Sequence, residues 1–265
     1  MKIRVDHNTV YAYDAPVRHS AQYLRLVPVA SARQRVIDWR LETPSTPLEM
    51  RDGYGNVLHL LTMERPVSEI RIRSTGVVET SAAIDEAPDE IRLSPLVFLR
   101  QSPLATADAA IGDFAEHYRR RAGTLSGLRD LAAAVLARVP FKAGITGAHS
   151  TAVEAFNEEN GVCQDHAHVF IACCRYLGVP ARYVSGYLYE PSGAAADVAG
   201  HAWAEAWVVD RWRSFDVTNG GPAGEHYVRV AVGPDYLDAC PIRGVRSGGG
   251  QEKMTAATVV GPEQQ

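Results

Sequence analysis

The sequence contains no apolar run that approaches the ~20 residues a membrane-spanning helix requires. Its opening segment, MKIRVDHNTVYAYD, alternates apolar and polar residues and carries charges, whereas a secretory signal peptide needs an uninterrupted apolar stretch. From these two absences we expect a cytoplasmic protein that has no membrane partner.

A strong excess of either charge is also missing. The 265 residues include 27 Lys plus Arg and 31 Asp plus Glu, which gives a formal net charge of −4. Nucleic acids and anionic membranes attract proteins through clustered positive charge, so this balance argues against both as partners. The arginines at 71–73 and 119–121 fit polar strand positions and the charged end of a helix.

Cysteine is scarce, with four residues in 265. That number is too small for a disulfide scaffold, and free thiols are the default in a reducing compartment. Cys-x-x-Cys pairs and the HExxH motif of metal sites are missing, and SGGGQ at 247–251 precedes no predicted helix that could hold a phosphate. We therefore expect neither a metal nor a cofactor.

The composition, 46% apolar and 22% charged, is that of an ordinary soluble globular protein. Residues 1–81 show the period-two alternation of strands, interrupted by Pro, Gly and Asp turns. Gly53 and Gly55 in RDGYGN supply one of these turns. Short strands at this spacing, without helices between them, predict an antiparallel β-sandwich-like N-terminal domain.

The pattern changes after this domain. Residues 82–105 contain three prolines and no sustained period, which predicts a connector packed on the surface. Residues 106–260 begin with helical spacing and end with strands, so they predict an α+β core. Thr151 and Glu154 form a predicted capping box for one short helix. Residues 261–265 predict a loose tail.

A helix is predicted between Gly161 and Gly178, because a glycine precedes the apolar periodicity and another, followed by proline, stops it. The adjacent Cys173 and Cys174 lie deep in this helix and are expected to be small core residues. Cys163 falls in its first turn instead. The unpaired N–H groups and the dipole at a helix N-terminus favour negative charge, which suits both a reactive thiolate and the oxyanion of an attacked carbonyl.

A thiolate nucleophile also needs a histidine to transfer its proton and a carboxylate or amide to orient that histidine. The segment GHAWAEAWVVDRWRSFDVTNG offers His201 on one strand and Asp216 on the next. A two-residue turn at 210–211 would leave them about 13 Å apart, too far for a hydrogen bond. We predict a four-residue loop at 208–211, which pairs the two tryptophans beside it, or else a kink in the strand after His201.

The stretches GVCQDHAHVFIACCRYLGVPARYVSGYL, GHAWAEAWV and FDVTNG together resemble the transglutaminase-like superfamily of papain-type cysteine enzymes, and in particular its bacterial members described as cysteine proteases. The segments YLRLVP and DGYGNV, and VRVAVGPDYLDACPIRGVRSGGG nearer the C-terminus, extend the resemblance to nearly the whole chain. It implies a papain-like core in which a helix that starts at the nucleophile packs on an antiparallel sheet. It also implies Cys163 as nucleophile, His201 as general acid and base, and Asp216 as the residue that fixes the imidazole. The chain departs from the family pattern at Val217, where a proline often follows the aspartate, and in its short VDRW connection.

Other residues are expected near this triad. Asn157 lies at the offset of the glutamine in papain-like enzymes and is a candidate oxyanion donor, with a turn or cap as its alternative role. Gln164, Asp165 and His166 are expected either to help hold the oxyanion or to support the start of the helix. Trp203 is a candidate wall of the substrate cleft, with a place in the core as the alternative.

Two other uses of these residues stay open. A zinc site would draw on five candidate side chains, Cys163, Asp165, His166, His168 and His201. Only three strong ligands among these five point roughly together. The alternative from another class is a non-catalytic peptide-binding or scaffold module on the same fold, although such a module has no need for the intact triad.

The predicted activity is cysteine-dependent acyl transfer on a carboxamide or peptide bond through a thioester. If water resolves the thioester, the protein is a protease or amidase; if an amine does, it is a transglutaminase. The choice depends on how far the site excludes water and which amine it docks. We favour hydrolysis because water is abundant. The expected partner is therefore a protein or peptide substrate, and the sequence leaves the oligomeric state open.

Overall fold

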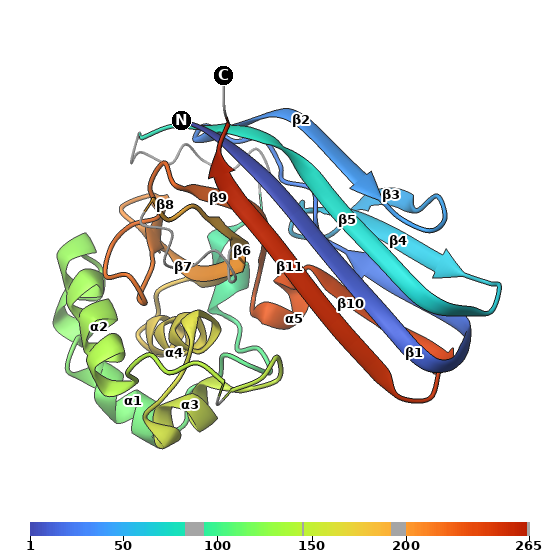
Figure 1. Ribbon diagram of the computed structural model, residues 1–265. Helices are drawn as coiled ribbons and strands as arrows, with labels where there is room; N and C mark the ends of the chain where they lie inside the picture. Colours follow the sequence, from blue (N-terminus) through green and yellow to red (C-terminus); the bar gives the residue numbers. More distant parts are fainter. Residues whose placement is uncertain (83–92, 145, 192–199, 264–265) are drawn as a thin grey trace.

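The structure is a computed structural model, and it describes residues 1–82, 93–144, 146–191 and 200–263 (Figure 1). Two antiparallel sheets are formed within these residues, one built mainly by the N-terminal part of the chain and one packed against helices. The predicted α+β class, with an N-terminal β region followed by a helix-containing core, is confirmed.

The first sheet has the strand order β2-β5-β1-β4-β3, and β10 and β11 also pair with β1. All of these pairings are antiparallel. The strands are β1 (Lys2–Leu24), β2 (Gln34–Glu42), β3 (Leu48–Arg51), β4 (Val57–Met63), β5 (Val67–Thr80), β10 (Ile242–Gly248) and β11 (Glu252–Pro262).

Strand β1 holds this sheet together. Its side chains alternate between buried and exposed positions at the start, as the period-two pattern predicted. Its first half pairs with β5 and β11, and its second half pairs with β4 and β10. Apolar residues from both halves meet in one cluster, for example Ile70 of β5 with Leu61 of β4. The sheet thus packs on itself in the sandwich-like manner expected of the N-terminal region.

The C-terminal strands correct the predicted division of the chain. Residues 106–260 were expected to form the core and residues 261–265 a loose tail, but residues 242–262 belong to the first sheet. The reason is that β1 is long and its outer edge needs partners for its backbone N–H and C=O groups. The pairing runs to Ile3 with Pro262, and the predicted tail residues 264–265 lie outside the described part.

The second sheet has the order β8-β7-β6-β9, and helix α4 packs across it (Figure 1). Its strands are β6 (Ala181–Leu188), β7 (Gly200–Val208), β8 (Arg211–Phe215) and β9 (Tyr227–Gly233). The α-helices are α1 (Ala109–Glu116), α2 (Leu125–Arg138), α3 (Ala152–Glu158), α4 (Cys163–Tyr176) and α5 (Tyr236–Ala239). Short 3-10 helices η1 (Pro95–Leu99) and η2 (Arg119–Arg121) precede α1 and α2 respectively.

Local signals set the ends of the helices around the site. The predicted capping box of α3 is present, because the Thr151 hydroxyl accepts from the Glu154 N–H at 3.2 Å and the Glu154 carboxylate accepts from the Thr151 N–H at 2.8 Å. Helix α4 ends before Gly178, whose φ of +82° is the left-handed conformation that favours glycine. The predicted limits of the nucleophile helix are therefore confirmed.

The predicted surface connector contributes to the core. Residues 83–92 of the connector at 82–105 lie outside the described part, but Phe98 in η1 is fully buried. Its ring meets Trp212 edge to face, with centroids 5.4 Å apart. The segment lies at the surface as predicted at Leu96 and Val97, which are exposed, but it also inserts Phe98 beside the second sheet, which a pattern without a period does not reveal.

The two sheets are joined by side-chain amides at the edge strand β9. The Gln34 carboxamide accepts from the Arg229 N–H at 2.9 Å and donates to the Arg229 carbonyl at 2.7 Å. The Asn56 carboxamide accepts from the Val232 N–H at 2.8 Å and donates to its carbonyl at 2.7 Å. We call Gln34 and Asn56 the amide clamp. Each clamp residue satisfies one residue of the edge as a neighbouring strand would.

Candidate active site

Cys163 is the first residue of α4 and is partly buried. Asp165 fixes this helix start, because its Oδ2 accepts from the Val162 N–H at 2.8 Å and from the Thr146 hydroxyl at 2.6 Å. Gly161 allows this close approach, since a Cβ at that position would lie 2.7 Å from the Asp165 Cβ. The helix start is therefore held by a fully buried carboxylate, and Cys163 lies beside the N–H groups that the first turn leaves without helical partners.

The hairpin between β7 and β8 has the predicted register but a shorter turn. Trp207 pairs with Trp212, and the next pair closes a two-residue turn rather than the four-residue loop expected at 208–211. Val209 and Asp210 form this turn with φ values of +51° and +60°. Two consecutive positive φ values match the right-handed twist of paired strands, and this explains how so tight a turn is possible without an Asn-Gly sequence.

This register brings His201 and Asp216 together. The ladder between β7 and β8 ends at the pair Ala204 and Phe215, and Asp216 then bridges to Gly221. His201 Nε2 and Asp216 Oδ2 lie 2.7 Å apart. The 13 Å separation of the alternative register is thus avoided, as the loop prediction required.

Asp216 is held as an anion by several donors. Besides His201, the Tyr227 hydroxyl and the Asn219 side-chain amide donate to Oδ2, each at 2.7 Å. The Asn219 N–H donates to Oδ1 at 3.1 Å. Burial alone would raise the pKa of Asp216, but the hydrogen bonds and the nearby imidazole lower it below the usual value.

His201 is correspondingly held as a cation. Burial disfavours its charged form, but the hydrogen bond with Asp216 and the neighbouring Cys163 outweigh burial and raise the pKa of His201 to about 10. Its ring stacks on Trp203 with centroids 6.3 Å apart. The imidazole is therefore oriented by a carboxylate, and Cys163 lines the same cavity as His201.

Cys163 and His201 line one cavity of about 240 Å³. Both regions of the molecule contribute to its walls, since His7 and Arg25 come from the N-terminal β region. The remaining lining residues are mostly apolar or aromatic: Val162, Gln164, Tyr183, Ser185, Gly186, Tyr187, Gly200, Ala202, Val230, Tyr236 and Pro241.

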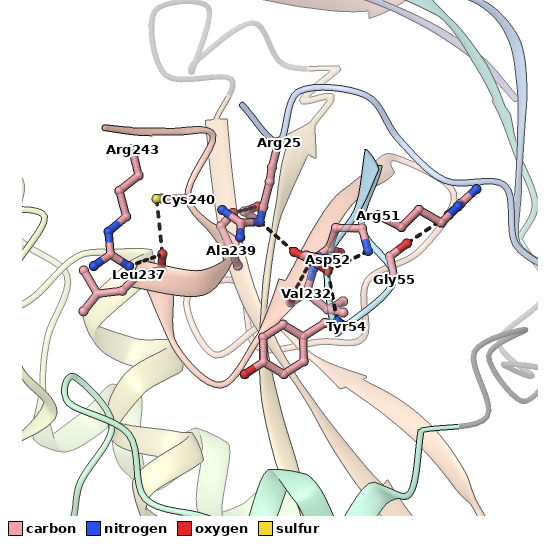
Figure 2. A network of polar contacts seen from close by, with 12 residues as sticks. Arg25, Arg51, Asp52, Tyr54, Gly55, Val232, Leu237, Ala239, Cys240 and Arg243 are labelled. Atoms are coloured by element: carbon pink, nitrogen blue, oxygen red, sulfur yellow. Dashed lines mark hydrogen bonds and ion pairs between the residues drawn. The ribbon is translucent and has the colours of Figure 1, made fainter. Parts of the chain in front are cut away.

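The two residues from the β region have fixed partners. His7 Nδ1 lies 2.8 Å from the Tyr187 hydroxyl, and burial lowers the pKa of His7 to about 4, so it is neutral at pH 7. Arg25 Nε donates to Asp52 Oδ2 at 2.9 Å, as Figure 2 shows. The Asp52 carboxylate in turn accepts from Asn56 of the amide clamp at 2.9 Å. The cavity wall is thus connected to the contact between the two sheets.

Gln164 and His166, which were expected to support the site, both lie in the first turn of α4. Gln164 lines the cavity and donates to the carbonyls of Gly147 and Ala148, each at 3.3 Å. His166 is fully buried, with Nδ1 2.9 Å from the Thr218 hydroxyl and Nε2 2.7 Å from the Val139 carbonyl. Burial lowers the pKa of His166, so it packs as a neutral residue.

Two predicted residues do not reach the cavity. Asn157 is exposed on α3 and is not among the lining residues, so the structure does not bring this candidate oxyanion donor to Cys163. The prediction from the sequence offset of the papain glutamine was wrong because the end of α3 and a turn separate Asn157 from α4. Trp203 is buried behind His201 and also contacts Tyr227, with centroids 5.4 Å apart; it supports the imidazole and does not line this cavity.

Two residues in the site were missed from the sequence. Asn219 stands in the quoted FDVTNG motif, and its amide could have been recognised as a donor three residues after Asp216. Tyr227 comes from β9, and no local pattern marks it, because its contact with Asp216 depends on the place of β9 in the sheet. Both residues complete the set of donors around the carboxylate.

The described residues include no group of three or more His, Cys, Asp or Glu side chains arranged to hold a metal ion. His168, one member of the considered zinc set, is fully buried and accepts from the Tyr236 N–H at 3.2 Å. Within the same part of the chain, no helix combines the length and apolarity needed to cross a membrane.

Two family descriptions match the chain. Residues 3–79 match the "Bacterial transglutaminase-like N-terminal region", and residues 113–217 match the "Transglutaminase-like superfamily". The first match covers most of the N-terminal part of the first sheet, and the second includes both Cys163 and Asp216.

Whole-length relatives are similar to this chain. An uncharacterized protein of Mycobacterium leprae (strain TN) is 34% identical, over 94% of this chain and 94% of that protein. An uncharacterized protein of Mycobacterium bovis is 30% identical, over 92% of this chain and 87% of that protein. The crystal structure of "a Putative Cysteine Protease from Cytophaga hutchinsonii" has the same fold, with a TM-score of 0.78 at 21% identity over 100% of this chain and 91% of that one.

Proposed function

This chain belongs to the transglutaminase-like superfamily, and we propose that it is an enzyme that catalyses cysteine-dependent acyl transfer on a carboxamide or peptide bond. The observations that carry the proposal are that Cys163 and His201 line one cavity and that His201 Nε2 lies 2.7 Å from Asp216 Oδ2. A non-catalytic module would need neither the histidine held as a cation nor the cysteine placed at a helix start.

The proposed chemistry follows from these positions. The Cys163 thiolate attacks the substrate carbonyl carbon, and the carbonyl π electrons move to oxygen. As the tetrahedral intermediate collapses, the C–N bond breaks and the His201 imidazolium gives its proton to the departing amine. A thioester remains. A water molecule then gives its proton to His201 and attacks the thioester, which releases a carboxylic acid and restores the thiolate.

Two features stabilise the charges in these steps. Asp216, with its donors Tyr227 and Asn219, keeps the His201 ring in one orientation and favours its protonated form. We assign the N–H groups of the first turn of α4, which begins at Cys163, as donors to the developing oxyanion, because this turn leaves them without helical partners. The second oxyanion donor proposed here is therefore backbone at this turn rather than Asn157.

Hydrolysis is the favoured outcome over transfer to an amine. A protonated amine acceptor is usually received by a carboxylate, and no acidic side chain lines the cavity within the described part of the chain. Arg25 contributes a guanidinium to the wall instead. Water has no such requirement, so we assign the enzyme as a protease or amidase.

Thiol labelling tests this proposal. The protein is exposed to iodoacetamide at pH 6, and the products are followed by intact-protein mass spectrometry and peptide mapping, with Cys163→Ser as the comparison variant. We expect a single label at Cys163 that is lost in the variant, because only this thiol has a paired imidazole. Slow labelling spread over all four cysteines would mean that the thiolate is not activated and would overturn the proposal.

A further inference from the structure

A groove adjoins the candidate active-site cavity on its β-region side. It encloses about 410 Å³, inside the ~300 to 1,000 Å³ typical of ligand pockets. Tyr236 lines both the groove and the cavity that holds Cys163. Ala148 lines the groove as well, and its carbonyl accepts from Gln164 of the cavity at 3.3 Å. Tyr236 thus lies between the cavity and the groove, and a substrate too long for the cavity would enter the groove by passing this residue.

Two buried polar residues of β1 line this groove. Ser20 is 5% exposed and Gln22 is 7% exposed. Ser20 Oγ and Gln22 Oε1 have no hydrogen-bond partner among the residues that the structure describes. Leaving such an atom unpaired costs about 1–3 kcal/mol, and native proteins keep few of them. Each oxygen has less than 1 Å² of accessible surface, so a ligand in the groove would supply the missing bonds once the side chains that cover these atoms move.

The spacing of this pair fits the main chain of an extended peptide. Ser20 and Gln22 are two residues apart on one face of a strand, so they lie about 7 Å from each other. The N–H and C=O groups on one edge of an extended peptide repeat at the same interval. A serine hydroxyl can donate to a carbonyl or accept from an N–H, and a glutamine Oε1 accepts from an N–H.

We propose that this groove binds the extended main chain of a polypeptide substrate, on one side of the bond attacked by Cys163. The inference rests on the proposed function, and it names the substrate as a polypeptide. The Tyr11 ring also lines the groove beside the two polar anchors, and Arg246, another lining residue, lies over the Tyr13 ring at 5.1 Å. A small amide that fills only the cavity would reach neither Ser20 nor Gln22.

Alanine peptides joined to a thiol-reactive group test the proposal, because they offer main-chain bonds and only methyl side chains. One series, acetyl-peptidyl chloromethyl ketones, places the peptide on the acyl side; the other, bromoacetyl peptides, places it on the leaving-group side. Each series contains one to five alanines, which extend up to about 17 Å. The measured quantity is the second-order rate constant for labelling Cys163, in wild type and in the double variant Ser20→Ala with Gln22→Met.

In at least one series we expect the rate constant to rise at least tenfold between one and five alanines in wild type. The double variant should lose most of that rise while its melting temperature stays equal or increases, because the replaced atoms have no partner to lose. Gln101→Met, on the exposed part of the connector, is the matched control and should keep the full rise.

Two results would overturn this inference: no dependence on length in either series, or a dependence that persists in the double variant. In both cases selective labelling of Cys163 by the shortest reagent would leave the proposed function intact. Failure of the proposed function has a different signature, which is the absence of selective labelling at Cys163 by any reagent.

Discussion

The two ends of α4 place cysteines in opposite environments. Cys163 in the first turn is partly exposed and lines the cavity together with His201. Cys173 and Cys174, three turns further on, are fully buried among apolar residues. Burial raises the pKa of Cys173 to about 12 and that of Cys174 well above its ordinary value. One helix therefore carries a thiol placed for chemistry and two thiols that only fill space.

Histidines repeat this contrast. Burial lowers the pKa of His168 to about 4, and its Nε2 accepts a backbone hydrogen bond. His201 is also buried, yet its pKa is raised to about 10 because Asp216 and Cys163 contact it. Burial is similar in the two cases, and the charged partners decide the outcome. Two features therefore distinguish the site residues from the buried cysteines and histidines of the core: the position of Cys163 at the start of a helix, and the charged partner of His201.

Removing the imidazole is expected to abolish most of the difference in thiol reactivity between Cys163 and the buried cysteines. In His201→Asn the iodoacetamide rate of Cys163 at pH 6 should fall by about ten- to a hundredfold, because an ordinary thiol is only about 0.3% ionised at that pH. Peptide mapping after timed labelling measures this rate. His117→Asn, on the exposed end of α1, is the matched control. An unchanged rate in His201→Asn would show that the helix start alone activates the thiol.

Removing the carboxylate charge of Asp216 should bring the pKa of His201 closer to the pKa values of the other buried histidines. In Asp216→Asn its pKa is expected to fall from about 10 by roughly 1 to 3 pH units, the usual effect of a neighbouring opposite charge. NMR titration of the ring carbon or nitrogen signals measures the shift.

The same change has a stability signature. The folded pKa of His201 lies above its unfolded value of 6.5, so the stabilisation by its proton is fully present below pH 6.5 and is lost as the pH rises toward 10. Wild type should therefore lose stability over this interval, and Asp216→Asn should lose less. Equal pH dependence in both proteins would contradict the assignment of Asp216 as the partner.

Removing the side chain that fixes the start of α4 tests how much this helix start contributes to the reactivity of Cys163. Asp165→Ala leaves the Val162 N–H and the Thr146 hydroxyl without their acceptor, which is expected to lower the free energy of unfolding by about 1–3 kcal/mol. The labelling rate of Cys163 should fall severalfold at the same time. Urea denaturation measures the stability. Asp113→Ala on the exposed face of α1 serves as the control, and an equal loss there would make the effect nonspecific.

The smallest change concerns the hydroxyl that supports Asp216. Tyr227→Phe removes one donor and leaves the Asn219 amide and His201 in place, so we expect a two- to tenfold slower labelling of Cys163 and a loss of about 1–2 kcal/mol in stability. Tyr23→Phe, half-exposed on β1, is the matched control. If only stability changed, Tyr227 would be a packing residue without influence on the imidazole.

Much of this site could be predicted from the sequence because its signals are local. Gly161 and Gly178 mark the ends of α4, and the spacing of the two tryptophans of the hairpin fixes the register that joins His201 to Asp216. The turn length was wrong because a tight turn of Val209 and Asp210 requires positive φ from residues that seldom adopt it. The period and spacing of residues in the sequence therefore predict the strand register well but predict the geometry of the turn poorly.

The parts that were missed depend on contacts between distant segments. The return of residues 242–262 to β1 and the role of Tyr227 both follow from strand neighbours far apart along the chain. Alternation in a strand states which face is buried but does not name its partner. Asn157 was misplaced for a related reason, since an offset along the chain does not say which way a helix surface faces.

The amide clamp has a consequence for how the protein behaves among copies of itself. The edge strand β9 belongs to the sheet that carries His201, and an uncovered edge is a template on which strands of other molecules add. Gln34 and Asn56 occupy that template with single side chains, so the edge is closed without a further strand. The β region thereby covers the edge of the sheet that carries His201. A fragment made without residues 1–82 would expose β9 to self-association.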